Sequence, residues 1–287
     1  MATARLLLGR ERWTVSAVAR ALDLSRSHLS AHREPKEPRG RAVRSTDDHS
    51  LLTSIRGVTD RRATYGYRRV AALLRQAADP VVANHKRVYR VMREAKLLLP
   101  RYTGLPERPH EGKVITPCSD MRWCSDSFEI RCWSGERVHV AFALDCCDRE
   151  AISWVAKAEH LTGDDIRDLM AQSLEGRFGA GTTRLPHAIE WLSDNGPPYT
   201  AHATRAFGHD SGFVVCNTPA YSPESNGIAE AFVKTFRRDY VYLAKLDDAA
   251  SVLRQLAAWF HDYNEHHPHR GLGMRSPRQF RALRTAA

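Results

Sequence analysis

Apolar positions recur at helical spacing in the first third of the chain and at both strand and helix spacing in the rest. Residues 14–33 show a short apolar stripe, a break, and Ser25 as the cap of a second helix, which predicts a helix-turn-helix. Residues 47–98 show three further stripes, the last of them capped by Asn84, which predicts a second all-helical unit. Short amphipathic helices are common, so these two units do not define a function by themselves.

The rest of the chain is predicted to be a tether followed by an α/β domain. Prolines recur between 99 and 120 and indicate a semi-extended connection. Strands are expected near 121–133, 136–145, 150–157 and 212–216, with one more ending at Asp194, and helices near 163–177, 200–209 and 247–264 and around Glu230. We therefore divide the chain into a helix-turn-helix segment with a linker (1–41), a second helical domain (42–98), a tether (99–120) and an α/β domain (121–287).

Two acids stand at places where a strand does not need them. Asp194 follows a short apolar run and precedes Asn195 and Gly196, so it is expected at the carboxyl end of a strand, where open α/β sheets bind ligands. Asp126 lies inside the first predicted strand, a position that disfavours Asp unless something compensates its charge. A divalent cation is one candidate, because hard cations such as Mg²⁺ take oxygen ligands and leave room for substrate phosphates.

A third acid, Glu230, lies on a helix that the Ser-Pro-Glu at 222–224 is predicted to begin. The apolar face of this helix repeats every fourth residue, and Glu230 falls on the other face together with Lys234 and Arg237. A carboxylate beside two cations suits a metal ion near a phosphate. A solvated helix face with an ordinary intrahelical ion pair is the alternative interpretation.

Longer stretches around these acids make the pattern specific. They are Trp-Cys-Ser-Asp at 123–126, Phe-Ala-Leu-Asp-Cys-Cys-Asp-Arg-Glu at 142–150, Ser-Pro-Glu-Ser-Asn-Gly-Ile-Ala-Glu at 222–230, and Tyr263-Asn264 with His267-Pro268-His269. In this order they resemble the second-frame (OrfB) transposase of the insertion sequence 3 family, and most of all its insertion sequence 2 branch. The resemblance implies an RNase H-like, retroviral integrase-like catalytic core preceded by small all-α helix-turn-helix DNA-binding units.

The same resemblance implies an enzyme, a DDE transposase. Asp126, Asp194 and Glu230 would be catalytic and would bind two Mg²⁺ (or Mn²⁺) ions, and Arg237 would be the basic residue that accompanies them. The enzyme would bind the terminal inverted repeats of its element and cleave DNA to free a 3′-hydroxyl. That hydroxyl would attack a phosphodiester near the other end of the element, giving a joined circular intermediate that later integrates into target DNA. It would act as a dimer or larger assembly on DNA, and it would work with an upstream-frame protein by fusion or association. The alternatives are a DNA-binding regulator with a silent core and a non-transposing RNase H-like nuclease.

Charge also separates the two parts of the chain. Residues 1–113 hold 24 Lys and Arg against 11 Asp and Glu, whereas residues 114–287 hold 19 against 22. A basic first part and a slightly acidic second part suggest a DNA-binding region joined to a metal-binding body, although a solvated Arg-rich domain would have the same composition. The predicted DNA-contacting residues are Arg26, Ser27, His28 and Arg33 in the first unit, Lys86, Arg87, Arg90 and Arg93 in the second, and Lys234 and Arg237 in the core.

Other features bear on location and on metal chemistry. The six cysteines include no Cys-x-x-Cys pair, which predicts free thiols in a reducing compartment rather than a zinc site. The histidines at 261, 266, 267 and 269 are expected to have hydrogen-bonded structural or DNA-backbone roles rather than to bind metal. The sequence has no run of about 18 apolar residues that would span a membrane and begins with a poor signal peptide. We expect a cytoplasmic, bacterial-type protein that is associated with the nucleoid when it acts.

Overall fold

The computed structural model describes residues 14–26, 29, 47–100, 116–217 and 227–285. The chain forms two compact units, Met1–Leu51 and Leu52–Ala287. The predicted linker at 34–41, most of the tether and the predicted helix start at 222–224 lie outside the described residues. The four domain boundaries drawn from the sequence stay predictions.

The first unit contains the start of the predicted helix-turn-helix. Helix α2 (Val15–Ala21) begins at Thr14, whose hydroxyl accepts a backbone N–H of the first turn at 3.2 Å. The chain turns at Asp23, which has a φ of 49°, a conformation that Asp adopts more readily than most residues. Leu29 is buried against α2, and its N–H bonds to the carbonyl of Ser25 at 3.1 Å. The first helix, the turn and the beginning of the second helix are therefore confirmed.

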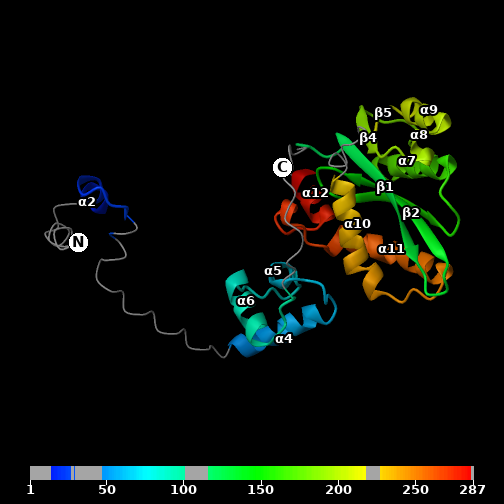
Figure 1. Cartoon of the computed structure of the whole chain (residues 1–287). Helices are drawn as coiled ribbons and strands as arrows, with labels where there is room; N and C mark the ends of the chain where they lie inside the picture. The colour runs from blue at the N-terminus through cyan, green and yellow to red at the C-terminus, as the bar shows by residue number, and fades with distance from the viewer. Residues whose placement is uncertain (1–13, 27–28, 30–46, 101–115, 218–226, 286–287) are drawn as a thin grey trace. The chain divides into compact units, whose positions relative to one another are not determined.

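The predicted second helical domain consists of α4 (Asp47–Thr59), α5 (Tyr67–Gln76) and α6 (His85–Glu94), which are labelled in Figure 1. The side chain of Asn84 accepts the N–H of Lys86 at 2.9 Å, so the predicted cap of α6 is confirmed. The apolar stripes of α5 and α6 are buried, as their helical spacing requires; the buried residues are Val70, Ala71, Ala72, Leu74, Val88, Val91 and Met92.

The α/β domain is built on one five-stranded sheet with the order β3-β2-β1-β4-β5. The first three strands are antiparallel neighbours, whereas β4 and β5 run parallel to β1. All five strands expected from the sequence are present, as β1 (Arg122–Arg131), β2 (Arg137–Asp145), β3 (Ala151–Lys157), β4 (Ile189–Ser193) and β5 (Phe213–Asn217). This mixed sheet is the arrangement predicted for an RNase H-like core.

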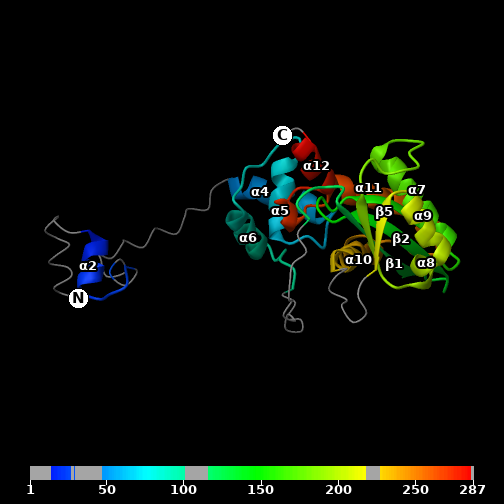
Figure 2. The ribbon, with the colours of Figure 1, turned by 90° about the horizontal axis from the view of Figure 1, so that it is seen from above.

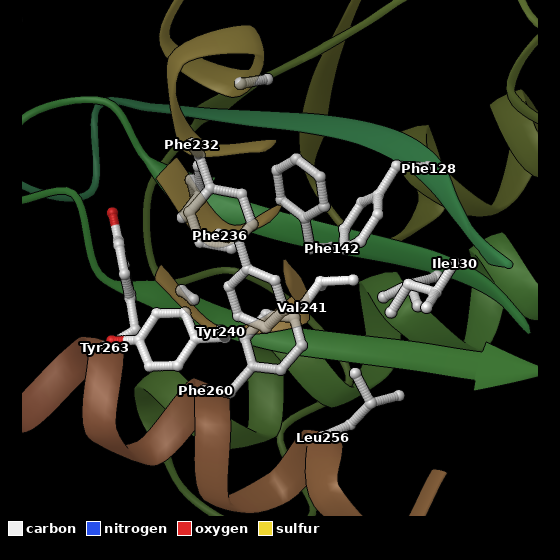
Figure 3. Close-up of a cluster of buried hydrophobic side chains, with 14 of the residues drawn as sticks. Phe128, Ile130, Phe142, Phe232, Phe236, Tyr240, Val241, Leu256, Phe260 and Tyr263 are labelled. Carbon is white, nitrogen blue, oxygen red and sulfur yellow. The ribbon is translucent and has the colours of Figure 1, made fainter. Parts of the chain in front are cut away.

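Helices cover both faces of the sheet, as Figures 1 and 2 show. On one face α7 (Gly163–Phe178) and α9 (His202–Asp210) pack over residues such as Trp123 and Trp191. On the other face α10 (Gly227–Asp239) and α11 (Ala249–His266) enclose the aromatic cluster of Figure 3. Alternate residues of each strand point to opposite faces. The position of a residue in β1 or β4 therefore decides which helical layer it meets.

Three short elements were not predicted, and one predicted helix is divided. The segment expected as a helix near 200–209 consists of α8 (Pro197–Thr200) and α9. Proline is well suited to the first turn of α8, because it has no N–H that would need a partner there. The three unpredicted elements are η2 (Val241–Leu243), η3 (Arg270–Leu272) and α12 (Pro277–Thr285).

A buried arginine organises the acids near the ends of β2 and β3. Arg177 of α7 donates to Asp145 at 3.1 Å, to Asp148 at 2.7 Å and to Glu150 at 2.5 Å, and its side chain is 1% exposed. Glu150 also accepts a hydrogen bond from Arg278 of α12 at 3.0 Å. All three acids are tied into one network of ion pairs, which gives them a structural role.

Candidate active site

Asp126 of β1 and Asp194, the residue after β4, are brought near each other by the pairing of these two parallel strands. Trp123 of β1 pairs with Trp191 of β4, and Cys124 pairs with Leu192. Asp126 lies two residues beyond Cys124, and Asp194 lies two residues beyond Leu192, so the two acids follow the last pair of this register and lie within electrostatic reach of each other. Cys124 and Leu192 belong to the core beneath α10 and α11. Because alternate residues share a face, both acids are directed to that side of the sheet.

The carboxyl group of Asp126 has few partners and lies among other acids. It is half-buried and accepts the backbone N–H of Ser127 at 2.7 Å. Burial raises its pKa to about 6. The Ser127 N–H and the positive charge of Arg237 oppose this rise, whereas the negative charges of Asp194 and Glu230 add to it. Asp126 is therefore close enough to Asp194 and to Glu230 to be repelled by both.

Asp194 lies just beyond the last residue of β4, as the sequence predicts. Its carboxylate accepts the N–H of Gly196 at 3.1 Å, and its backbone carbonyl accepts the side-chain amide of Asn217 at 3.0 Å. A Cβ atom at Gly196 would lie 3.1 Å from the same carboxylate oxygen, which is closer than most such contacts. Glycine at this position therefore lets the turn fold back against the acid.

Glu230 is presented by α10, whose other face is fixed in the core. Phe232, Phe236 and Tyr240 are buried, which confirms the predicted apolar stripe, whereas Glu230 and Lys234 are exposed. Figure 3 shows these aromatic rings packed between α10, the sheet and α11. The packing fixes the rotation of the helix about its axis. The carboxylate of Glu230 is thereby kept out of the core and within the electrostatic reach of Asp126.

Arg237 lies seven residues after Glu230 and is braced against β1. Its guanidinium donates to the backbone carbonyl of Glu129 at 3.3 Å and stands 5.8 Å from the centre of the Phe128 ring. The side chain is half-buried. Arg237 thus links α10, to which it belongs, directly to β1, the strand that carries Asp126.

The three acids do not form a preassembled cluster of metal ligands. Within the described parts of the chain, no three Asp, Glu, His or Cys side chains are gathered closely enough to hold an ion. The chemistry of the donors nevertheless fits a hard divalent cation, because all three residues offer carboxylate oxygens. The mutual repulsion that helps to raise the pKa of Asp126 is also the kind of interaction that a bound cation would relieve.

Two residues beneath the acids were not predicted from the sequence. The Tyr199 hydroxyl lies 3.0 Å from the hydroxyl of Ser125, and both side chains are buried. Burial raises the pKa of Tyr199, and the nearby charges of Asp126 and Asp194 raise it further. Tyr199 follows Asp194 by five residues, and this short spacing after a candidate ligand is the signal that could have identified it.

The predicted DNA-contacting residues differ in how far they reach solvent. On α6, Lys86 and Arg93 are exposed, whereas Arg87 and Arg90 are half-buried. Arg90 lies 3.6 Å from Glu94, an ion pair within the helix, and the Arg93 guanidinium stands 5.9 Å from the ring centre of Tyr89. Arg26 in the first unit and Lys234 on α10 are exposed, and Ser27, His28 and Arg33 lie outside the described residues.

The remaining predictions about metal and membrane are tested in part. All six cysteines are free thiols. His267 is buried, and its Nδ1 lies 2.9 Å from the hydroxyl of Tyr65, which confirms a hydrogen-bonded structural role for this histidine. Among the described helices, none is both long and apolar enough to cross a membrane.

Comparison with known proteins finds similar families, relatives and solved structures. Residues 117–223 and 212–277 match families described as Integrase core domain, and residues 46–103 match an HTH-like domain. The chain is 46% identical to Transposase InsD for insertion element IS2A/D/F/H/I/K of Escherichia coli, over 98% of this chain and 94% of that protein. It is also 46% identical to Transposase InsD for insertion element IS2-9 of Escherichia coli strain K12, over 97% and 92%. Among solved structures, the catalytic domain of Mos1 mariner transposase covers 58% of this chain and 82% of its own, with 18% identity and a TM-score of 0.42.

These findings define an integrase-core DDE transposase, a polynucleotidyl transferase that acts on DNA. More closely, the chain belongs to the InsD-type (OrfB) transposases of the insertion sequence 3 family, those of IS2-like insertion elements. The family resemblance drawn from the sequence is confirmed. Because transposases match this chain over almost their whole length, the transposase is favoured over a DNA-binding regulator and over a non-transposing nuclease.

Proposed function

We propose that Asp126, Asp194 and Glu230 are the catalytic carboxylates of this transposase and together hold two Mg²⁺ (or Mn²⁺) ions. The observation that best supports this proposal is the environment of Asp126. The pairing of β1 with β4 brings it near Asp194. Burial raises its pKa to about 6, and the charges of Asp194 and Glu230 add to the rise. When bound, two such ions would stabilise the attacking and leaving oxygens of an in-line displacement at phosphorus.

The residues around the acids would orient them for this reaction. The Ser127 N–H would hold one oxygen of Asp126 and the Gly196 N–H one oxygen of Asp194, which leaves their other oxygens available. Arg237 would keep α10 close to β1 through the Glu129 carbonyl and would meet a phosphate near the cut. A water would first attack the phosphorus of a phosphodiester at an element end, and the departing 3′-oxygen would become a free 3′-hydroxyl. That hydroxyl would then attack a second phosphodiester and displace the 3′-oxygen there, with no covalent protein–DNA intermediate.

The basic residues of the helical domains would supply the affinity for DNA. Lys86 and Arg93 are exposed on α6, and cations in such positions bind phosphates without reading sequence. Each neutralised phosphate adds roughly 0.9 to the slope of log affinity against log salt, so binding of end DNA should weaken steeply with salt. Specific recognition of the terminal inverted repeats would come from the helix-turn-helix units. At least two copies of the chain would hold two DNA ends, together with the upstream-frame protein.

The catalytic assignment is tested by three conservative variants and one control. Asp126→Asn, Asp194→Asn and Glu230→Gln each remove one charge with little change of shape. We expect each variant to bind end DNA normally, to bind Mn²⁺ less tightly in calorimetry, and to lose the joining of pre-cut 3′-hydroxyl ends. Asp168→Asn is the matched control, because Asp168 is an exposed acid of α7, on the other face of the sheet. Normal joining by Glu230→Gln would remove Glu230 from the site.

A further inference from the structure

A buried tyrosine connects the turn before α5 to the catalytic domain. Tyr65 is 2% exposed, although it precedes a helix in a small basic domain. Its hydroxyl lies 2.9 Å from Nδ1 of His267, and the two rings meet edge to face at 5.6 Å. His267 directly follows the end of α11 and is fully buried. A Tyr side chain in this position is anchored at both its ring and its hydroxyl.

Two arginines on either side of Tyr65 reach carboxylates of the catalytic domain. Arg62 makes a two-bond pair with Asp262 of α11, with one bond of 2.7 Å, and Asp262 also accepts the hydroxyl of Tyr240 at 2.9 Å. Arg69 of α5 donates to Asp239 at 3.1 Å. The planar guanidinium fork of Arg62 matches the carboxylate and fixes its direction as well as its distance.

These contacts form a closed set that is largely removed from solvent. The guanidinium of Arg69 stands 5.1 Å and that of Arg62 5.8 Å from the centre of the Tyr65 ring. The Asp239 side chain is 2% exposed and is also bound by Arg238 at 2.6 Å. A buried charge that loses its partner is strongly destabilising, so the set resists partial opening. We call it the joint; its members are Arg62, Tyr65, Arg69, Asp239, Asp262 and His267.

The joint is attached to the helix that carries the third catalytic acid. Asp239 is the last residue of α10 and follows Glu230 by nine residues, which is roughly 13 Å along a helix. Arg237, the residue that binds the β1 carbonyl, lies between them. A single straight element therefore has the proposed active site near one end and the joint at the other.

We propose that the joint positions the DNA-binding helical domain on α10, so that DNA held by α6 is aligned with Glu230. This inference rests on the proposed roles of Glu230 and of the basic face of α6. The members of the joint are positioning residues, because none of them touches the reacting atoms. Loss of the joint should leave DNA binding and folding in place while it slows the chemical step.

The proposal is tested by reversing the charge of Arg62, and the same change at Arg61 is the control. Arg62→Asp breaks the pair with Asp262, and the double variant Arg62→Asp with Asp262→Arg restores it in the opposite sense. Arg61→Asp is the matched control, since Arg61 is exposed and bonds to the Gly57 carbonyl of its own helix at 2.8 Å. Both single variants remove the same charge from the DNA-binding part, so any general loss of DNA affinity is common to both.

Three quantities are measured on the full chain: affinity for duplexes copied from the element ends, joining of pre-cut ends at saturating DNA, and amide exchange in α10. We expect Arg62→Asp to join ends at least about tenfold more slowly than Arg61→Asp, since ångström-scale misplacement can cost on the order of 100-fold. The end affinities of the two should agree, and the double variant should recover the rate. End DNA should slow amide exchange of 227–239 in Arg61→Asp and not in Arg62→Asp.

Each other outcome overturns the proposal. Equal joining rates for the two single variants mean that the joint does not position DNA. A loss of affinity for end DNA in Arg62→Asp alone means that the joint contributes to DNA binding instead. If Arg62→Asp is unfolded in a thermal melt, Arg62→Gln replaces it and the same comparison applies. A wild type that is inactive even with the upstream-frame protein present contradicts the proposed catalytic function and leaves the joint to be decided by amide exchange. Amide exchange in α10 still decides the joint in that case, because it does not depend on chemistry.

Discussion

Replacing Arg177 by Met should be among the most damaging single changes in the catalytic domain. The Arg177 side chain is 1% exposed and lies within 3.1 Å of the carboxylates of Asp120, Asp145, Asp148 and Glu150. Methionine would fill much of the volume but would leave these acids without the central positive charge. Removing one partner of a buried ion pair costs about 3–5 kcal/mol. We expect a loss of this size in the free energy of unfolding at pH 7.5.

The loss should shrink as the pH falls. Burial raises the pKa of Asp145 to about 6, the charge of Asp148 raises it further, and Arg177 opposes the rise. Without Arg177 this pKa should move higher. An acid whose pKa is higher in the folded state than in the unfolded state binds its proton more tightly when folded, so stability increases as the pH falls through the folded pKa. Protonation should therefore partly replace the missing cation near pH 5.

Urea unfolding of the wild type and two variants at pH 7.5 and pH 5 measures both effects. Arg167→Met is the matched control, because Arg167 lies on the same helix and pairs with Asp164, whose side chain is 80% exposed. An exposed pair of this kind contributes about 0–1 kcal/mol. A deficit for Arg177→Met that is below about 1 kcal/mol, or that is the same at both pH values, would refute the reasoning, because the buried acids would then not depend on Arg177.

Two further predictions concern the proposed active site and the end of α11. Arg237→Ala should lower the free energy of unfolding by about 1–3 kcal/mol through loss of its charged hydrogen bond to a β1 carbonyl. The alanine variant should also raise the pKa of Asp126 above about 6 in an NMR titration and leave residual metal-dependent cleavage, whereas Arg237→Lys should preserve this pKa. An unchanged pKa of Asp126 in the alanine variant would contradict the proximity of the two charges. His269→Asn should make the free energy of unfolding less dependent on pH between about 6.5 and 4. Burial lowers the pKa of His269 to about 3 in the folded state, so protonation of this histidine favours the unfolded chain below pH 6.5. Urea unfolding across this range tests it, and an unaltered pH slope would exclude His269 as a source of acid sensitivity.

The elements of the fold were largely predictable because each depends on a local pattern. The apolar stripe of Phe232, Phe236 and Tyr240 fixes both the existence of α10 and the face that it buries. Asp194 was placed correctly at a strand end because an apolar run stops there and turn residues follow. These features are contained in a few neighbouring residues, and the structure changes their boundaries only slightly.

Contacts between distant segments could not be predicted in the same way. The adjacency of Asp126 and Asp194 depends on pairing of Trp123 with Trp191, which are separated by a helix and by two other strands. Tyr65 lies just before α5, and no local pattern marks it, because its buried contacts come from a histidine 202 residues later in the sequence. Helix α12 has few apolar residues and is fixed partly by hydrogen bonds from its arginines to Glu150, so no local stripe identified it.

The partners of each acid distinguish the structural acids from the proposed catalytic ones more clearly than burial does. Asp148, Glu150 and Asp239 are buried, and each is bound by at least one arginine. Asp126 and Asp194 are half-buried, and in the described parts of the chain each carboxylate accepts a backbone N–H and no ion pair. Their repulsion opposes the pairing of β1 with β4, which the buried tryptophans stabilise from the opposite face of the sheet. Strand pairing therefore holds together two acids that, in the described parts of the chain, have no ion pair. A positive charge supplied from outside the chain would lower the energy of this arrangement more than it would at any acid already bound by arginine.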